Sequence, residues 1–119
     1  MSTMVPSEHP PIDLDALRVM LGGDENLVSM ILDKFRAEIF GDIEQLKSLQ
    51  AGDQAEPIRA LAHRLKGTCG NAQANQLSEI AKLLQFAMAA GELDQAAGLI
   101  KALDAERVVL EQYLAEQGY

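Results

Sequence analysis

Residues 58–72 read IRALAHRLKGTCGNA, and the spacing of the apolar residues in this stretch predicts an amphipathic α-helix. On a helical wheel with about 100° per residue, one apolar stripe extends roughly 60° to either side of Leu65. The members of this stripe are Ile58, Leu61, Ala62, Leu65, Cys69 and Ala72. His63 falls about 160° from Leu65 on the wheel. The stretch therefore predicts a helix that buries one face in a core and presents an imidazole on the other.

The face around His63 carries small and cationic residues. Gly67 and Gly70 are expected to share this face, one and two turns further along the helix. Glycines inside a helix cost about 0.8–1 kcal/mol each relative to alanine, so we expect a function that offsets this cost. The remaining residues on or beside the face are Arg59, Ala60, Arg64 and Lys66.

The combination of an imidazole, an ammonium group and free space is typical of phosphoryl transfer, which depends mostly on positioning and charge stabilisation. Lys66 is placed to neutralise phosphoryl oxygens on His63, and Gly67 leaves room for the added group. An isolated exposed histidine would more simply be a solvated surface residue. Histidine, lysine and glycine at positions i, i+3 and i+4, all off the apolar stripe, favour phosphoryl transfer instead.

Outward from this segment, apolar spacing and turn residues predict four further helices. The expected spans are 14–21, 25–51, 53–72, 75–90 and 93–115, with the start of the third between 53 and 56. Asp13, Asp24, Asp53 and Asn75 precede or open these spans and are the expected N-caps. Gly41 lies inside the second span, where we expect a bend or a short break.

Composition and loop length define the fold class. The chain has 119 residues, of which 48% are hydrophobic and only 4% aromatic, which favours packed helices over a sheet. Short loops make consecutive helices antiparallel neighbours. We therefore expect an all-α protein, an antiparallel up-down four-helix bundle with a short extra N-terminal helix. Residues 12–119 would form this single domain, and residues 1–11 a flexible N-terminal lead-in.

Charge and cysteine content exclude several classes of function. The formal net charge of −8 disfavours nucleic acid and anionic membranes as partners. The single cysteine, Cys69, cannot form an internal disulfide, and the N-terminus lacks a signal-peptide pattern, so we expect a cytoplasmic protein. His9 and His63 have no metal-ligand spacing, and we expect no metal site.

The segment His63-Arg64-Leu65-Lys66-Gly67-Thr68 resembles the His-x-Leu-Lys-Gly-Ser/Thr signature of histidine phosphotransfer (HPt) domains. The similarity extends to the segments 17–27, Gly52-Asp53 and Gly91-Glu92. The resemblance implies a four-helix bundle that carries a phosphorylatable histidine midway along one helix. It also implies a stoichiometric phosphocarrier of a multistep phosphorelay, without an ATP site and therefore not an enzyme in its own right.

By this resemblance His63 is the phosphoryl acceptor and donor, Lys66 its charge partner and Gly67 the residue that provides clearance. The implied partners are receiver domains of response regulators or hybrid sensor kinases, which supply Mg²⁺, so that this chain needs no cofactor and acts as a monomer. The residues expected to contact a receiver are Arg59, Ala60, Arg64, Gly70 and Gln73. Gln73 is a departure, because the family commonly has glycine ten residues after the histidine.

A second hypothesis remains. The chain could be a helical bundle that binds and inhibits a receiver or a kinase without being phosphorylated. The intact set of His63, Lys66 and Gly67 argues against this alternative, because such a protein has no need of the histidine.

Overall fold

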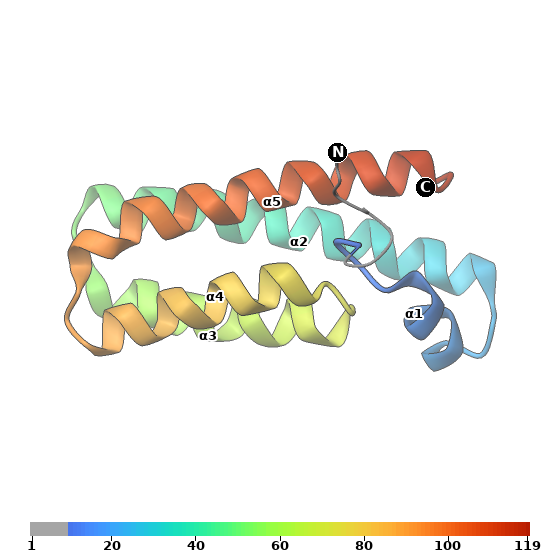
Figure 1. The fold of residues 1–119 in the computed structure, drawn as a ribbon, viewed down its shortest axis with the longest axis horizontal. Helices are drawn as coiled ribbons and strands as arrows, with labels where there is room; N and C mark the ends of the chain where they lie inside the picture. Colours follow the sequence, from blue (N-terminus) through green and yellow to red (C-terminus); the bar gives the residue numbers. More distant parts are fainter. Residues whose placement is uncertain (1–9) are drawn as a thin grey trace, which may run out of the picture.

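The computed structural model describes residues 10–119, which form helices joined by short turns and contain no strand (Figure 1). The elements are α1 (Leu14–Met20), α2 (Glu25–Ala51), α3 (Ala55–Asn71), α4 (Asn75–Ala89), the 3₁₀ turn η1 (Leu93–Gln95) and α5 (Ala96–Glu116). Of the predicted lead-in, residues 1–9 lie outside the described part of the chain. Pro11 is buried, so the packed structure extends past the predicted boundary at residue 12.

Helices α2 to α5 form an antiparallel four-helix bundle. In it α2 packs against α3 and α5, and α4 packs against the same two helices. With 27 residues, α2 is much longer than α3, which has 17. Figure 1 shows α1 beside the end of α2 that extends past the α3–α4 pair. The predicted fold class, a four-helix bundle with a short extra N-terminal helix, is confirmed.

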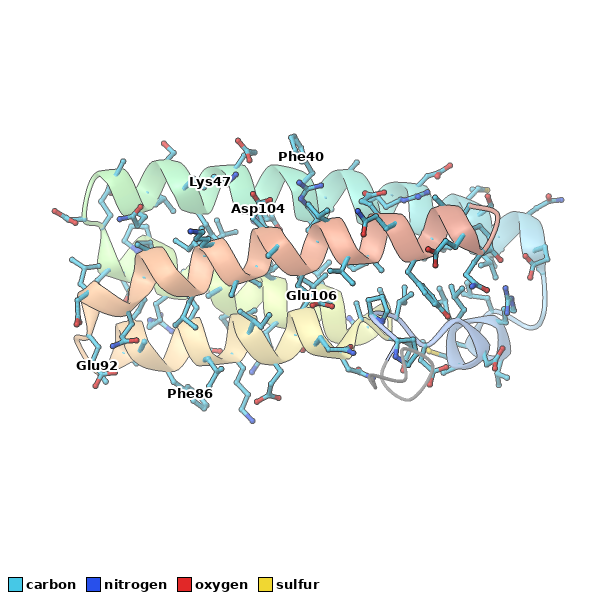
Figure 2. The ribbon with its side chains drawn as sticks, turned by 45° about the horizontal axis from the view of Figure 1, so that its top comes forward. Phe40, Lys47, Phe86, Glu92, Asp104 and Glu106 are labelled. Carbon is cyan, nitrogen blue, oxygen red and sulfur yellow. The ribbon has the colours of Figure 1, made fainter. Side chains whose placement is uncertain are left out.

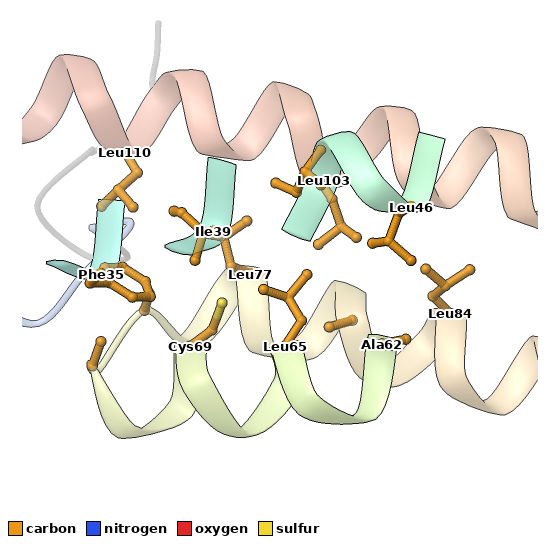
Figure 3. Packing of buried hydrophobic residues seen from close by; sticks show 14 of the residues in the cluster. Phe35, Ile39, Leu46, Ala62, Leu65, Cys69, Leu77, Leu84, Leu103 and Leu110 are labelled. Carbon is orange, nitrogen blue, oxygen red and sulfur yellow. The ribbon is translucent and has the colours of Figure 1, made fainter. Parts of the chain in front are cut away.

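The apolar stripe of α3 lies in the centre of the core. Every residue predicted for this stripe is buried, and Leu65 is completely inaccessible. Figure 3 shows Leu65 and Cys69 directed between side chains of the other three bundle helices, among them Ile39 of α2 and Leu77 of α4. Because α3 is anchored by this stripe, the orientation of its opposite face is determined by the core.

Of the bend or short break predicted at Gly41, the break is absent, because α2 is continuous through this residue. An added Cβ at Gly41 would meet no atom within 4 Å, which shows that the residue faces open space. The buried stripe of α2 includes one charged residue, Asp42, which is 6% exposed and lies between the core residues Ile39 and Leu46.

Two of the four predicted N-caps are present. Asp13 Oδ1 accepts a hydrogen bond from the backbone N–H of Ala16, and Asp24 Oδ1 accepts one from Leu27. The other two predictions are wrong. Residue Gln54 precedes α3, and Asn75 is the first residue of α4, and neither helix has a side-chain cap.

The turn between α3 and α4 anchors α1. Gln73 adopts a left-handed backbone conformation, with φ +67°. Its carbonyl oxygen accepts a hydrogen bond from the backbone N–H of Asp13 at 2.9 Å, and its Nε2 lies 3.2 Å from the sulfur of Met20. A positive φ favours glycine. This explains physically why glycine is the usual residue at this position in the family that the motif resembles.

Replacement of Gln73 should therefore reveal the strain of its backbone. We expect Gln73→Gly to leave the free energy of unfolding within about 1 kcal/mol of wild type, because relief of the strained φ offsets the greater entropy of the unfolded chain. Gln73→Val should cost about 1–2 kcal/mol, because a β-branched residue tolerates this conformation poorly. Urea unfolding of both variants measures the difference. Equal stabilities would contradict the prediction.

Polar side chains tie α5 to α2 on the face shown in Figure 2. Lys47 Nζ donates to Asp104 Oδ2 at 3.0 Å, and this bond holds the pKa of the Asp104 carboxyl below its ordinary value. The Arg107 guanidinium lies 5.2 Å from the centroid of the half-exposed Phe40 ring. These contacts fix the α2–α5 pair independently of α3.

Candidate functional site

His63 is exposed near the middle of α3, with the buried residues Ala62 and Leu65 on the other side of the same helix. Its imidazole makes no hydrogen bond or ion pair with any residue in the range 10–119. A ring that is held on a rigid helix and has no bonding partner in the described structure is open to a reaction with a group on another molecule.

The helix surface is open one turn before and one turn after His63. An added Cβ at Gly67 would meet no atom within 4 Å, and Ala60, about one turn before His63, is exposed. Gly70 differs from the expectation that it shares this face. It is half-buried, and an added Cβ would lie 3.5 Å from Ser78 Oγ of α4. Gly70 therefore lies at the contact between α3 and α4, where a Cβ would make an ordinary van der Waals contact, and Gly67 has the more open surroundings.

The α3–α4 contact is strengthened at the same place by a side chain of α4. Ser78 Oγ donates a hydrogen bond to the carbonyl oxygen of Lys66 at 2.9 Å. Because this carbonyl belongs to the turn that follows His63, the bond fixes the backbone on which Lys66 and Gly67 stand.

Three cations lie in α3, and their charges are not equally available. Arg59 donates two hydrogen bonds to Glu56, at 2.9 and 2.6 Å, and this contact holds the pKa of the Glu56 carboxyl below its ordinary value. Arg64 forms an ion pair with Asp42 of α2 at 2.6 Å. Lys66 is half-buried and has no acidic partner within 4 Å among residues 10–119. The ammonium group of Lys66 is thus the least compensated positive charge on this helix.

Beneath the site, Cys69 is fully buried. Burial, together with the negative charges of Asp42 and Glu38, raises the pKa of the Cys69 thiol to about 12. A thiol with this pKa is protonated near neutral pH and is a poor nucleophile. Cys69 is therefore a core residue.

Gln73 is not brought close to His63. It follows the end of α3, about 15 Å along the helix axis at 1.5 Å per residue. Gln85 of α4 was not predicted from the sequence. Along the bundle axis it is nearer to His63 than Gln73 is, because α4 is antiparallel to α3 and Gln85 follows Ser78 by two turns. Its Oε1 is buried without a hydrogen-bond partner in the described residues. In the sequence, nothing marks Gln85 as a residue near the site, because it is a single glutamine that follows a core leucine.

Residues 10–119 contain neither a metal-binding cluster nor a membrane-spanning helix. No group of three or more histidine, cysteine, aspartate or glutamate side chains is arranged to hold a metal ion. No helix in this range is long and apolar enough to span a bilayer.

The fold and the site together define a helical bundle that presents a histidine from a rigid helix to another molecule. Comparison with known proteins identifies the family. The Hpt domain model matches residues 30–116, and the chain belongs to this family. It is similar to the crystal structure of histidine-containing phosphotransfer protein B (HptB) from Pseudomonas aeruginosa PAO1, with 27% identity and a TM-score of 0.82. The alignment covers 92% of this chain and 97% of that chain. No curated protein matches the chain significantly.

Membership in the Hpt family establishes the general function. The chain is a histidine phosphotransfer protein of phosphorelay signalling, a phosphocarrier rather than a classical enzyme, and domains of this family interact with receiver domains.

Proposed function

We propose that His63 carries the phosphoryl group and exchanges it with the aspartate of a receiver domain. The observation that supports this assignment most strongly is the exposed imidazole of His63 on α3, which has no bonding partner among residues 10–119. The sequence contains two histidines, and the other, His9, lies outside the described residues and outside the residues matched by the Hpt model.

The transfer step is a displacement at phosphorus. A ring nitrogen of His63 attacks the phosphorus of the receiver's aspartyl phosphate with its lone pair. The N–P bond forms while the P–O bond to aspartate breaks, and aspartate leaves as a carboxylate. No proton has to move for this exchange, because the attacking nitrogen is unprotonated and the leaving group is a stable anion. The reverse reaction returns the phosphoryl group to an aspartate.

The neighbours of His63 have distinct roles in this proposal. Lys66 stabilises the negative charge of the phosphoryl oxygens, and Gly67 lets the receiver approach the backbone of α3. Exposed Ala60 and the two arginines Arg59 and Arg64 contact the receiver at the edge of the site. Gly70 lies two turns after His63, at the α3–α4 edge of the surface offered to the receiver.

The chain itself would supply no cofactor. We propose that Mg²⁺ enters with the receiver, since Glu56 and Asp42, the carboxylates bonded to the arginines of α3, are each already paired. We further propose that the protein has no ATP site, acts as a monomer, does not bind membranes or nucleic acid, and works in the cytoplasm.

The stability of the phosphoryl label in acid and in alkali tests whether His63 is the phosphorylated residue. The chain is incubated with a phosphorylated receiver domain, and the product is exposed to acid and to alkali before peptide mapping by mass spectrometry. We expect an acid-labile, alkali-stable label on the peptide that contains His63. Binding without labelling would instead support an inhibitory bundle, and a label on another residue would refute the assignment.

Replacement of Lys66 should slow phosphoryl transfer without lowering the melting temperature. We expect Lys66→Ala to slow transfer by about 10- to 100-fold, because one stabilising charge is removed from the transition state. The melting temperature should stay close to that of wild type, because the side chain makes no ion pair within residues 10–119. Lys101→Ala on α5 is the matched control, since Lys101 is likewise a cation that makes no ion pair within residues 10–119. Equal transfer rates for the two variants would contradict the proposed role.

A further inference from the structure

We propose that Asp42 is a positioning residue for the phosphotransfer reaction. It holds the guanidinium of Arg64 beside His63 in the orientation that binds the acidic surface of a docked receiver domain. The inference rests on the proposed function of His63, and it assigns a role to a buried carboxylate that the reaction step does not use.

The position of Asp42 is unfavourable for stability alone. The residue is 6% exposed and occupies the apolar stripe of α2, where its neighbours in the stripe are isoleucine, phenylalanine and leucine. Its Oδ1 accepts one hydrogen bond, from Arg64 Nη2 at 2.6 Å, and its Oδ2 is buried without a partner in residues 10–119. Burial of a charge is costly, and an apolar side chain of similar volume is often at least as stable at such a site.

Arg64 does not behave as a simple counter-ion for Asp42. Its side chain is 60% exposed, whereas that of Asp42 is 8% exposed. A guanidinium has five N–H donors, and only one group of Arg64, Nη2, is bonded within the described residues. The remaining donors are held on the surface in a defined orientation, because a short bond to a buried, immobile carboxylate fixes the planar group. A preorganised cation binds an anion with a smaller loss of side-chain entropy.

The position of Arg64 identifies the ligand. Arg64 follows His63 directly and reaches toward α2, whereas Ser78 of α4 contacts the backbone of Lys66 on the other flank. Any receiver that reacts with His63 must bring its phosphorylated aspartate to this surface, together with the oxygen ligands that hold Mg²⁺. Carboxylates around that aspartate complement a guanidinium beside the histidine. Asp42 and Arg64 would therefore act on docking and leave the chemical step unchanged.

The test measures two quantities: the dissociation constant of the complex with a receiver domain, and the maximal transfer rate at saturating receiver. The receiver is the tightest binder of wild type in a panel of receiver domains. We expect Asp42→Asn and Arg64→Ala each to raise the dissociation constant by about 5- to 20-fold and to leave the maximal rate within about twofold. The double variant should bind no more weakly than Arg64→Ala alone, because Asp42 acts through Arg64.

A second variant of Asp42 distinguishes weaker binding from a loss of folded protein. Asp42→Leu should melt at the same or a higher temperature than wild type and still show the weaker binding, a combination that a purely structural role does not produce. Asp104→Asn is the matched control, because Asp104 also pairs with a cation of another helix, Lys47, but on the α2–α5 face. It should change neither quantity.

Several outcomes would overturn the inference: unchanged binding by folded Asp42→Asn or Asp42→Leu, additive effects in the double variant, or no binding of any receiver by wild type. Failure of the proposed function has a different signature. In that case receivers bind wild type, and the effects of Asp42 on binding persist, but His63 takes no label.

Discussion

His63→Gln should yield a folded bundle that takes no phosphoryl group from any phosphorylated receiver. Glutamine has a similar length and can be exposed on a helix, but its amide has no nucleophilic nitrogen, so the N–P bond cannot form. Because His63 is exposed and has no partner in residues 10–119, the free energy of unfolding should change by no more than about 0.5 kcal/mol. Radiolabel transfer and thermal melting, followed by circular dichroism, measure the two effects separately.

His9→Gln is the natural control, because His9 is the only other histidine of the chain. This variant should accept the phosphoryl group at the rate of wild type. Labelling of His63→Gln, or loss of labelling in His9→Gln, would show that the phosphorylated residue has been misassigned.

Gly67→Leu should stabilise the protein and impair its function. The space around Gly67 is open, and leucine is a much better helix former than glycine, so the free energy of unfolding should rise by about 0.5–1 kcal/mol. Helical side chains point back toward the preceding turn, which here contains His63. The added side chain would cover the imidazole and hold the receiver away from it. We expect transfer to slow by about 100-fold, the scale of the penalty for misplacing reacting groups by about an ångström.

Gly41→Leu provides the comparison. Gly41 also lies inside a helix and faces open space, but it belongs to α2 and not to the helix that carries His63. It should give a similar gain in stability with no change in transfer rate. If both leucine variants transfer at the wild-type rate, Gly67 does not provide clearance. If both are slowed equally, the loss of activity is a general effect of helix stabilisation.

The comparison between sequence and structure is clearest in α3. The 100° period of its apolar residues placed every member of its buried stripe correctly and placed His63 on the outer face. Such a prediction succeeds because the period depends only on residues within one helix. N-caps were predicted less well. Asp13 and Asp24 form caps, whereas α3 and α4 follow Gln54 and Ala74 and have no side-chain cap.

Interactions between helices could not be predicted in the same way. Gly70 was expected beside His63 because the wheel describes one helix, whereas its contact with Ser78 depends on how closely α4 approaches. Asp42 attracted no notice in the sequence, since a carboxylate on a helix is usually solvated. Its pairing with Arg64 depends on the register between α2 and α3.

By itself, the sequence determined the helices, the buried face of α3 and the exposure of His63, since these follow from local spacing, turn residues and the motif. The tertiary structure alone decided which cations remain free. Arg59 is paired with Glu56 and Arg64 with Asp42, and Lys66 has no acidic partner within residues 10–119. The charge that a residue presents depends on the groups within about 4 Å of it, and across helices those groups are set by packing and register.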